Sequence, residues 1–181
     1  MRKLNLQAAV TTALAVALLA ACSTTPPPLP EPLFDAPAAV RAIRAAGGAA
    51  SSELDVQPLR DPQVEDLRKE AERLEKTGQY PQAAASLDQA LQLNPGDPAL
   101  LQERAESALL NQQLDDAERF ARQGLDGGSR VGPLCRRHWE TIAQVRDAKA
   151  RALPVEVPGA PSASDARRER DACTISAPPR Y

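Results

Sequence analysis

The chain has 181 residues, enough for one domain of ordinary size together with tails. Aromatic residues make up only 3% of the chain and alanine is abundant, which argues against a sheet-rich core and favours closely packed helices. The formal net charge is −2, and this balance gives no reason to expect binding to nucleic acid.

The first segment, residues 1–21, has the layout of a secretory signal peptide, because Arg2 and Lys3 precede a largely apolar run. The run leads into LAAC, which resembles the bacterial lipobox, and this resemblance implies that Cys22 becomes the first mature residue and carries acyl chains such as palmitate. An uncleaved anchor with an incidental cysteine is the alternative. Ser23 follows the cysteine where an aspartate would imply inner-membrane retention, so the sorting rule of such lipoproteins implies the outer membrane, facing the periplasm.

Residues 22–61 are predicted to form a lipid-anchored tether rich in proline and alanine. The segment 24–37 holds six prolines and should be extended polyproline II, with a reach of about 40 Å. Residues 38–46 (AAVRAIRAA) can form a short helix that ends at a pair of glycines. In that helix, Val40 and Ile43 could cover the exposed face of the first helical hairpin.

Residues 62–150 contain a pattern with a 34-residue period. The pattern has spacings of three, four and seven, which predict two amphipathic helices per unit. Shifting the sequence by the period superposes small or apolar residues: Leu67 on Leu101, Ala71 on Ala105, Ala83 on Ala117 and Leu91 on Leu125. The helices expected from this pattern are 62–77, 80–92, 98–111 and 114–126.

The period and these residues resemble the tetratricopeptide repeat (TPR). GQYPQA at 78–83 is similar to the family's turn between helices, and LQLNPGDP at 91–98 is similar to its connector between repeats. The second repeat departs from the pattern, with Gln112 at the turn glycine, Gly124 at a helix alanine and Ser129 at the connector proline. The resemblance implies an all-α fold, a short TPR-type helical-hairpin solenoid of two repeats, and leaves the ligand open.

A C-terminal capping helix is predicted at 133–150, because the 34-residue period continues there. Trp139 is too large for the close helix crossing that Ala105 permits at the equivalent position. No further helix should therefore pack on this one, and the indole should seal the end of the core. The remaining residues, 151–181, are expected to be a polar, largely disordered tail.

Two cysteines remain once Cys22 is acylated, namely Cys135 and Cys173. An exported chain matures under oxidising conditions, which favours a disulfide between them. Such a bridge would tie the tail to the capping helix and stabilise the fold by about 3–4 kcal/mol. Two free thiols are the alternative.

The sequence contains no pattern typical of an enzyme. His138 is the only histidine, and no second ligand stands near it. No glycine-rich phosphate loop, nucleophile–base pair or metal-ligand spacing is present in the sequence. We therefore expect a protein without catalytic residues, without a metal and without a cofactor other than the lipid on Cys22.

In TPR arrays, the first helices of the repeats line a concave groove that binds a peptide or a helix. The resemblance places this partner-binding stripe at Arg68, Glu72, Glu75, Gln102, Glu106, Leu109, Arg136 and Glu140. The family's version that grips a C-terminal carboxylate needs asparagines where Glu72 and Glu106 stand, so that specificity is not expected. A helix or extended segment of another envelope protein is the expected partner, and a merely solvated face is the alternative.

Three functions remain open at this point. The first is a non-enzymatic, membrane-anchored scaffold that binds a partner protein in the periplasm, in pilus or secretin assembly or in the regulation of cell-wall enzymes. The second is an enzyme of an unrecognised family. The third is an accessory subunit that tethers a partner to the membrane with little groove binding.

Overall fold

The computed structural model describes residues 34–48, 61–152 and 162–174, all of which belong to one compact unit, Leu33–Tyr181. These residues form seven helices and no strand, which confirms the predicted all-α fold class. The predicted signal peptide and Cys22 lie outside the described residues. The helices are α2 (Ala36–Gly47), α3 (Pro62–Lys76), α4 (Tyr80–Leu93), α5 (Pro98–Leu110), α6 (Leu114–Gly127), α7 (Pro133–Ala152) and α8 (Ala163–Ala172).

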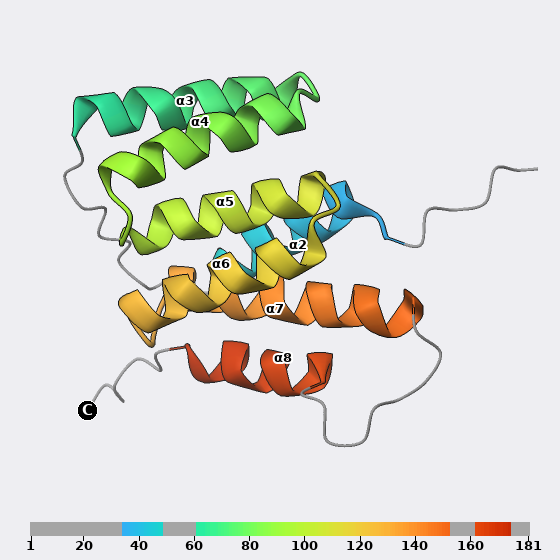
Figure 1. The fold of residues 1–181 in the computed structure, drawn as a ribbon. Helices are drawn as coiled ribbons and strands as arrows, with labels where there is room; N and C mark the ends of the chain where they lie inside the picture. The colour runs from blue at the N-terminus through green and yellow to red at the C-terminus, as the bar shows by residue number, and fades with distance from the viewer. Residues whose placement is uncertain (1–33, 49–60, 153–161, 175–181) are drawn as a thin grey trace, which may run out of the picture. The chain divides into compact units, whose positions relative to one another are not determined.

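Six of the helices pack in pairs as three hairpins, α3 with α4, α5 with α6 and α7 with α8 (Figure 1). The first helices of the pairs, α3, α5 and α7, run in the same direction and follow one another down the array (Figure 1). The helices α3 to α6 begin and end within one residue of the expected boundaries. The repeat period in the sequence therefore located the two central hairpins correctly.

Three helices begin with an aspartate cap and a proline in the first turn. Asp35, Asp61 and Asp97 accept hydrogen bonds from backbone amides of α2, α3 and α5 at 2.9, 2.8 and 2.8 Å. The carboxylate satisfies amides that have no partner inside the helix, and the proline removes one such amide. These caps fix the starts of the helices that build the groove.

The turns inside the first two hairpins share one backbone geometry. Gly78 has φ 74°, and Gln112, its equivalent in the second repeat, has φ 61°. The left-handed region suits glycine and strains a residue with a Cβ. The second repeat thus keeps the turn of the first even though its sequence lacks the glycine.

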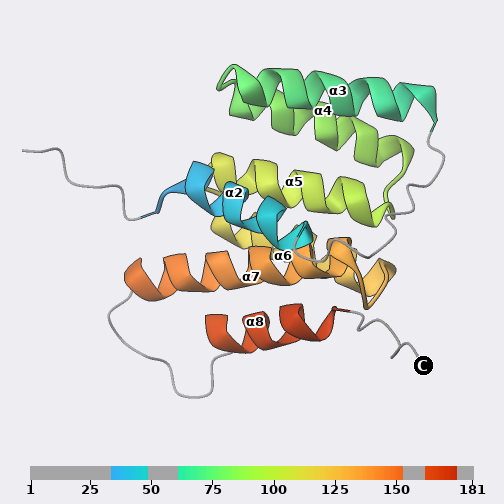
Figure 2. The ribbon, with the colours of Figure 1, turned by 180° about the vertical axis from the view of Figure 1, so that it is seen from behind.

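Helix α2 does not cover the first hairpin, so the expectation for Val40 and Ile43 is wrong. It packs against α7 and α5, on the side away from α6, as the two opposite views show (Figures 1 and 2). Val40 and Ile43 are buried there in one cluster with Leu109 of α5 and Val145 of α7. The apolar face of α2 fits α5 and α7 because small residues alternate with these larger ones and let the helices approach closely.

Helix α7 does not end the array, because α8 packs along it (Figure 1). The expected disordered tail is therefore wrong for Ala163–Ala172. Trp139 is half-buried against the cluster that contains Ala121 and Ala166, so its indole lies in the core at this end without excluding a further helix. The expectation of a lone capping helix is corrected to a third, shorter helical pair.

Candidate protein-binding groove

The predicted groove residues lie on α3, α5 and α7, but most of them are not open to solvent. Gln102, Glu106 and Leu109 of α5 have exposed fractions of 0, 1 and 0%, and Arg136 and Glu140 of α7 are buried as well. The three residues on α3 remain accessible, namely Arg68, Glu72 and Glu75. The groove expected along all three helices is thus shortened, because α2 and α8 cover its α5 and α7 parts.

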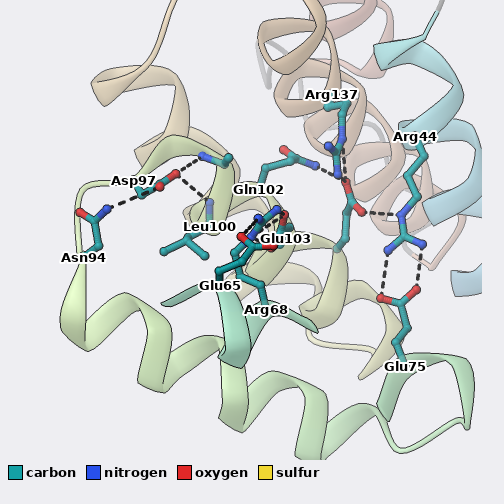
Figure 3. Close-up of polar contacts among 12 residues, drawn as sticks. Arg44, Glu65, Arg68, Glu75, Asn94, Asp97, Leu100, Gln102, Glu103 and Arg137 are labelled. Atoms are coloured by element: carbon teal, nitrogen blue, oxygen red, sulfur yellow. Dashed lines mark hydrogen bonds and ion pairs between the residues drawn. The ribbon is translucent and has the colours of Figure 1, made fainter. Parts of the chain in front are cut away.

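Glu106 is the centre of a buried polar network that joins three helices. Its partners Arg44, Gln102 and Arg137 are labelled in Figure 3. Glu106 accepts hydrogen bonds from Arg44 Nε of α2 at 2.8 Å and from Arg137 Nη2 of α7 at 2.5 Å. Gln102 Nε2 donates to Glu106 Oε1 at 2.9 Å and to Thr141 Oγ1 at 2.9 Å. A buried carboxylate is costly without such partners, and two guanidinium groups provide them here. Glu106 therefore holds α2 in place instead of contacting a partner.

Arg136 and Glu140 contact other helices of the same chain. Arg136 donates from Nε to the Ala46 carbonyl at 3.0 Å and from Nη2 to the Gly47 carbonyl at 3.1 Å, so it caps the end of α2. Glu140 accepts a hydrogen bond from Arg170 Nη1 of α8 at 2.6 Å. Both side chains stabilise the packing of flanking helices on α7.

The open part of the groove is a cavity of about 310 Å³ between α3, α4, α5 and the Arg44 side of α2. Ala71, Ala83 and Leu87 form its apolar floor. Charged side chains surround this floor, and the cavity lining contains Arg44, Glu65, Arg68, Lys69, Glu72, Glu75, Glu103, Glu106 and Arg137. A partner that enters must therefore satisfy charges at the rim and can bury only small apolar groups.

Two arginines cross this cavity between helices (Figure 3). Arg44 of α2 donates from Nη1 and Nη2 to the two carboxylate oxygens of Glu75 at 2.8 and 2.9 Å. Arg68 of α3 pairs with Glu103 of α5 and with Glu65, and the hydrogen bond to Glu103 raises the pKa of Arg68 above its ordinary value. The two arginines join the first hairpin to the rest of the array by ionic contacts.

Glu72 has a different environment from the other carboxylates of the cavity. It pairs with Lys76 of its own helix at 2.6 Å, and its side chain is 64% exposed. The hydrogen bond from Lys76 holds the pKa of the Glu72 carboxyl below its ordinary value, so this group is anionic at neutral pH. Glu72 is thus the carboxylate of the predicted stripe that is most available to a partner.

His138 lies in the core. Burial, followed by the positive charge of Arg137, lowers its pKa from 6.5 to about 3, so the imidazole is neutral. Neither ring nitrogen has a hydrogen-bond partner among the described residues, and the ring packs against Gly124 of α6. His138 thus acts as a packing residue in this fold.

Cys135 of α7 and Cys173, directly after α8, are joined by a disulfide with a Cα–Cα distance of 5.8 Å. This is the pair expected from the cysteine count. The described residues contain no cluster of three or more His, Cys, Asp or Glu side chains placed to hold a metal ion. Within the same residues, no helix is both long and apolar enough to cross a membrane.

Sequence reasoning missed Arg44, Glu103 and Arg137, which complete the cavity. Arg44 carries a usable signal, because it follows the buried Ile43 directly and so lies at the edge of the apolar face of α2. Glu103 and Arg137 give no such signal. They are equivalent positions of successive repeats, one residue beyond the predicted stripe, and only the contacts with Arg68 and Glu106 reveal them.

The helical pairs and their groove define the class of this fold, a TPR-type array. Residues 74–127 match the family model of the tetratricopeptide repeat, so the resemblance seen in the sequence is confirmed. Among solved structures, the globular C-terminal domain of LpoP from P. aeruginosa is similar, with 29% sequence identity and a TM-score of 0.53. The match covers 62% of this chain and 99% of that domain. A comparison with curated proteins gave no match.

Proposed function

We propose that this protein is a non-enzymatic scaffold of the bacterial cell envelope, which binds a partner protein through its TPR groove in the periplasm. The observation that carries the proposal is the likeness to the LpoP domain over 99% of that domain's length. TPR arrays present extended surfaces that bind other proteins, and this kind of binding needs no catalytic residues. Of the two settings considered from the sequence, this likeness favours the cell-wall machinery over pilus or secretin assembly.

The proposal includes lipid anchoring at Cys22, by which the helical domain would remain at the outer membrane. LAAC at the end of an apolar leader supports acylation there. Cys22→Ala should leave the protein unprocessed or soluble, which fractionation of membranes would detect. A processed, membrane-bound Cys22→Ala product would refute this part of the proposal.

Co-purification of the intact lipoprotein from its own membrane tests the scaffold function directly. We expect a cell-wall protein to be recovered with the wild type and not with a variant whose helical array is unfolded. A chain that recovers no envelope protein after cross-linking would overturn the scaffold function.

The tethering function has one observation in its favour, since α2 already fills the α5–α7 part of the groove. The two functions differ in where the partner binds. A scaffold requires partner binding by the described helices, so a lipid-free chain with intact α3 should still bind the partner. A tether would bind the partner outside the groove, so its binding would survive changes in the groove, and removal of the lipid would release the partner from the membrane.

A further inference from the structure

Three equivalent glutamates on the first helices of the pairs have unequal partners. Glu72, Glu106 and Glu140 are separated by the 34-residue period, on α3, α5 and α7. Glu106 pairs with Arg44 of α2 at 2.8 Å, and Glu140 pairs with Arg170 of α8 at 2.6 Å. Each thus binds an arginine from a flanking helix packed onto the array. Among the described residues, Glu72 has an ion pair only with Lys76 of its own helix.

Helix α2 shows what kind of helix this surface accepts. Its buried face consists of small and β-branched residues, including Ala39, Val40 and Ile43, which allow close approach to α5 and α7. Arg44, at the edge of that face, reaches Glu106 of α5 and Glu75 of α3 at 2.8 Å each. The surface of α5 and α7 next to the cavity therefore already binds a helix that has an apolar face of small residues and an arginine at its edge.

The cavity continues the α2 interface toward α3. Arg44 lines it on one side, and its floor of Ala71, Ala83 and Leu87 is also made of small and aliphatic side chains. The lining holds five carboxylates and four cationic side chains, and three of the four cations are already paired with carboxylates. The lining thus carries one more negative than positive charge, and Glu72, 64% exposed, is its most accessible carboxylate.

We propose that this cavity is the docking place of a partner helix with the chemistry of α2, whose small apolar side chains cover the floor and whose arginine pairs with Glu72. The proposal rests on the proposed function, because it describes how the partner binds in the groove. It assigns the partner an amphipathic, basic helix. Glu72 would then pair with an arginine of the partner, as Glu106 and Glu140 pair with arginines of this chain.

The probe is an amidated peptide with the sequence of residues 34–48, compared with the same peptide carrying glutamate in place of both arginines. Binding to the lipid-free full-length chain is followed by backbone amide shifts in NMR spectra. The protein variants are Glu72→Arg and the matched control Asp116→Arg. Asp116 of α6 likewise pairs with a basic residue of its own helix, Arg119, and is 41% exposed, but it does not line the cavity.

We expect the native peptide to shift the amides of α3 around Glu72 in the wild type and in Asp116→Arg. Glu72→Arg should weaken its binding at least about tenfold. The glutamate peptide should bind Glu72→Arg better than it binds the wild type, a reversal that a general loss of structure would not produce. Absence of binding, equal binding to Glu72→Arg, or shifts confined to α5 and α7 through exchange with α2 would each overturn the proposal.

The outcome can be separated from that of the proposed function. If a co-purified envelope partner is retained by Glu72→Arg, the docking site is wrong and the scaffold function stands. If the peptide binds as expected but no envelope protein is ever recovered, the site stands and the scaffold function fails.

Discussion

The close contact between Gly124 and His138 gives a quantitative test of how α6 packs on α7. A Cβ built on Gly124 would lie 2.2 Å from His138 Cε1 and 2.7 Å from its Nε2. His138 is 1% exposed, so its ring has no free space into which to move. Overpacking of this kind costs about 1–3 kcal/mol, whereas alanine gains up to about 1 kcal/mol over glycine inside a helix. Gly124→Ala should therefore destabilise the fold by about 1–2 kcal/mol.

The effect of Gly124→Ala on stability should change sign once the imidazole is removed. In a His138→Ala background the clash is absent, and only the gain in helix propensity remains. Gly124→Ala should then stabilise that variant by about 0.5–1 kcal/mol. Gly127→Ala in the same helix is the matched control, because its Cβ would meet only the Gly96 carbonyl at 3.7 Å. The control should have the same small effect in both backgrounds.

The measurement is urea unfolding followed by far-ultraviolet circular dichroism, carried out on all members of the double-mutant cycle. Contacting residues are expected to be strongly non-additive, and the coupling energy here should be about 1.5–3 kcal/mol. If Gly124→Ala stabilises the wild type, or destabilises both backgrounds equally, then His138 does not occupy the space beside Gly124. The packing of α6 on α7 would then be wrong.

Three further predictions concern the turns, the buried histidine and the disulfide. Gln112→Gly should stabilise the fold by about 0.5–1 kcal/mol and Gly78→Gln should destabilise it by about 1 kcal/mol, because both positions have positive φ. Thermal unfolding measures both effects. Changes in stability of the same sign for the two substitutions would show that turn strain is not the cause. The folded-state pKa of His138, about 3, lies below the unfolded value of 6.5, so its contribution is fully present above pH 6.5 and falls as the pH decreases toward 3. The loss should reach about 2 kcal/mol at pH 5, and urea unfolding of His138→Leu should show a flatter pH profile than the wild type. The Cys135–Cys173 disulfide closes a loop with a sequence separation of 38, so its reduction should lower the free energy of unfolding by about 4 kcal/mol and speed hydrogen exchange in α8. Detection by mass spectrometry of two freely alkylated thiols in the native protein would contradict the disulfide.

The central hairpins could be predicted from the sequence because their signals are local and repeated. The period superposes Ala71 on Ala105, and each pair of such positions marks a helix crossing that only small residues permit. Proline in the first turns of α3 and α5 and the aspartate before each set the starts to within a residue. Because the repeat period, the small residues at the crossings and the helix caps all indicate the same helices, few other assignments of these helices remain.

The two flanking helices were misjudged because their places depend on contacts distant in sequence. Helix α2 lies on α7 through the contacts of Arg136 with Ala46 and Gly47, a separation of about ninety residues that no periodicity reveals. Helix α8 did have a local signal. Ser162 and Asp165 form a capping box with reciprocal hydrogen bonds of 3.1 and 2.9 Å, and this motif predicts a helix start. Its docking on α7 depends on the disulfide and on Arg170.

The position of α2 also limits where the groove can act. Acylation of Cys22 would leave residues 23–33 as the connection between the lipid and the start of the described helical unit at Phe34. At about 3.1–3.6 Å per residue, such a connection reaches at most about 40 Å. The buried Glu106 network fixes α2 to α5 and α7, so if Cys22 is acylated, the groove can move no farther than this from the membrane without releasing α2. A partner of a groove anchored in this way would have to lie near that membrane or extend to the groove.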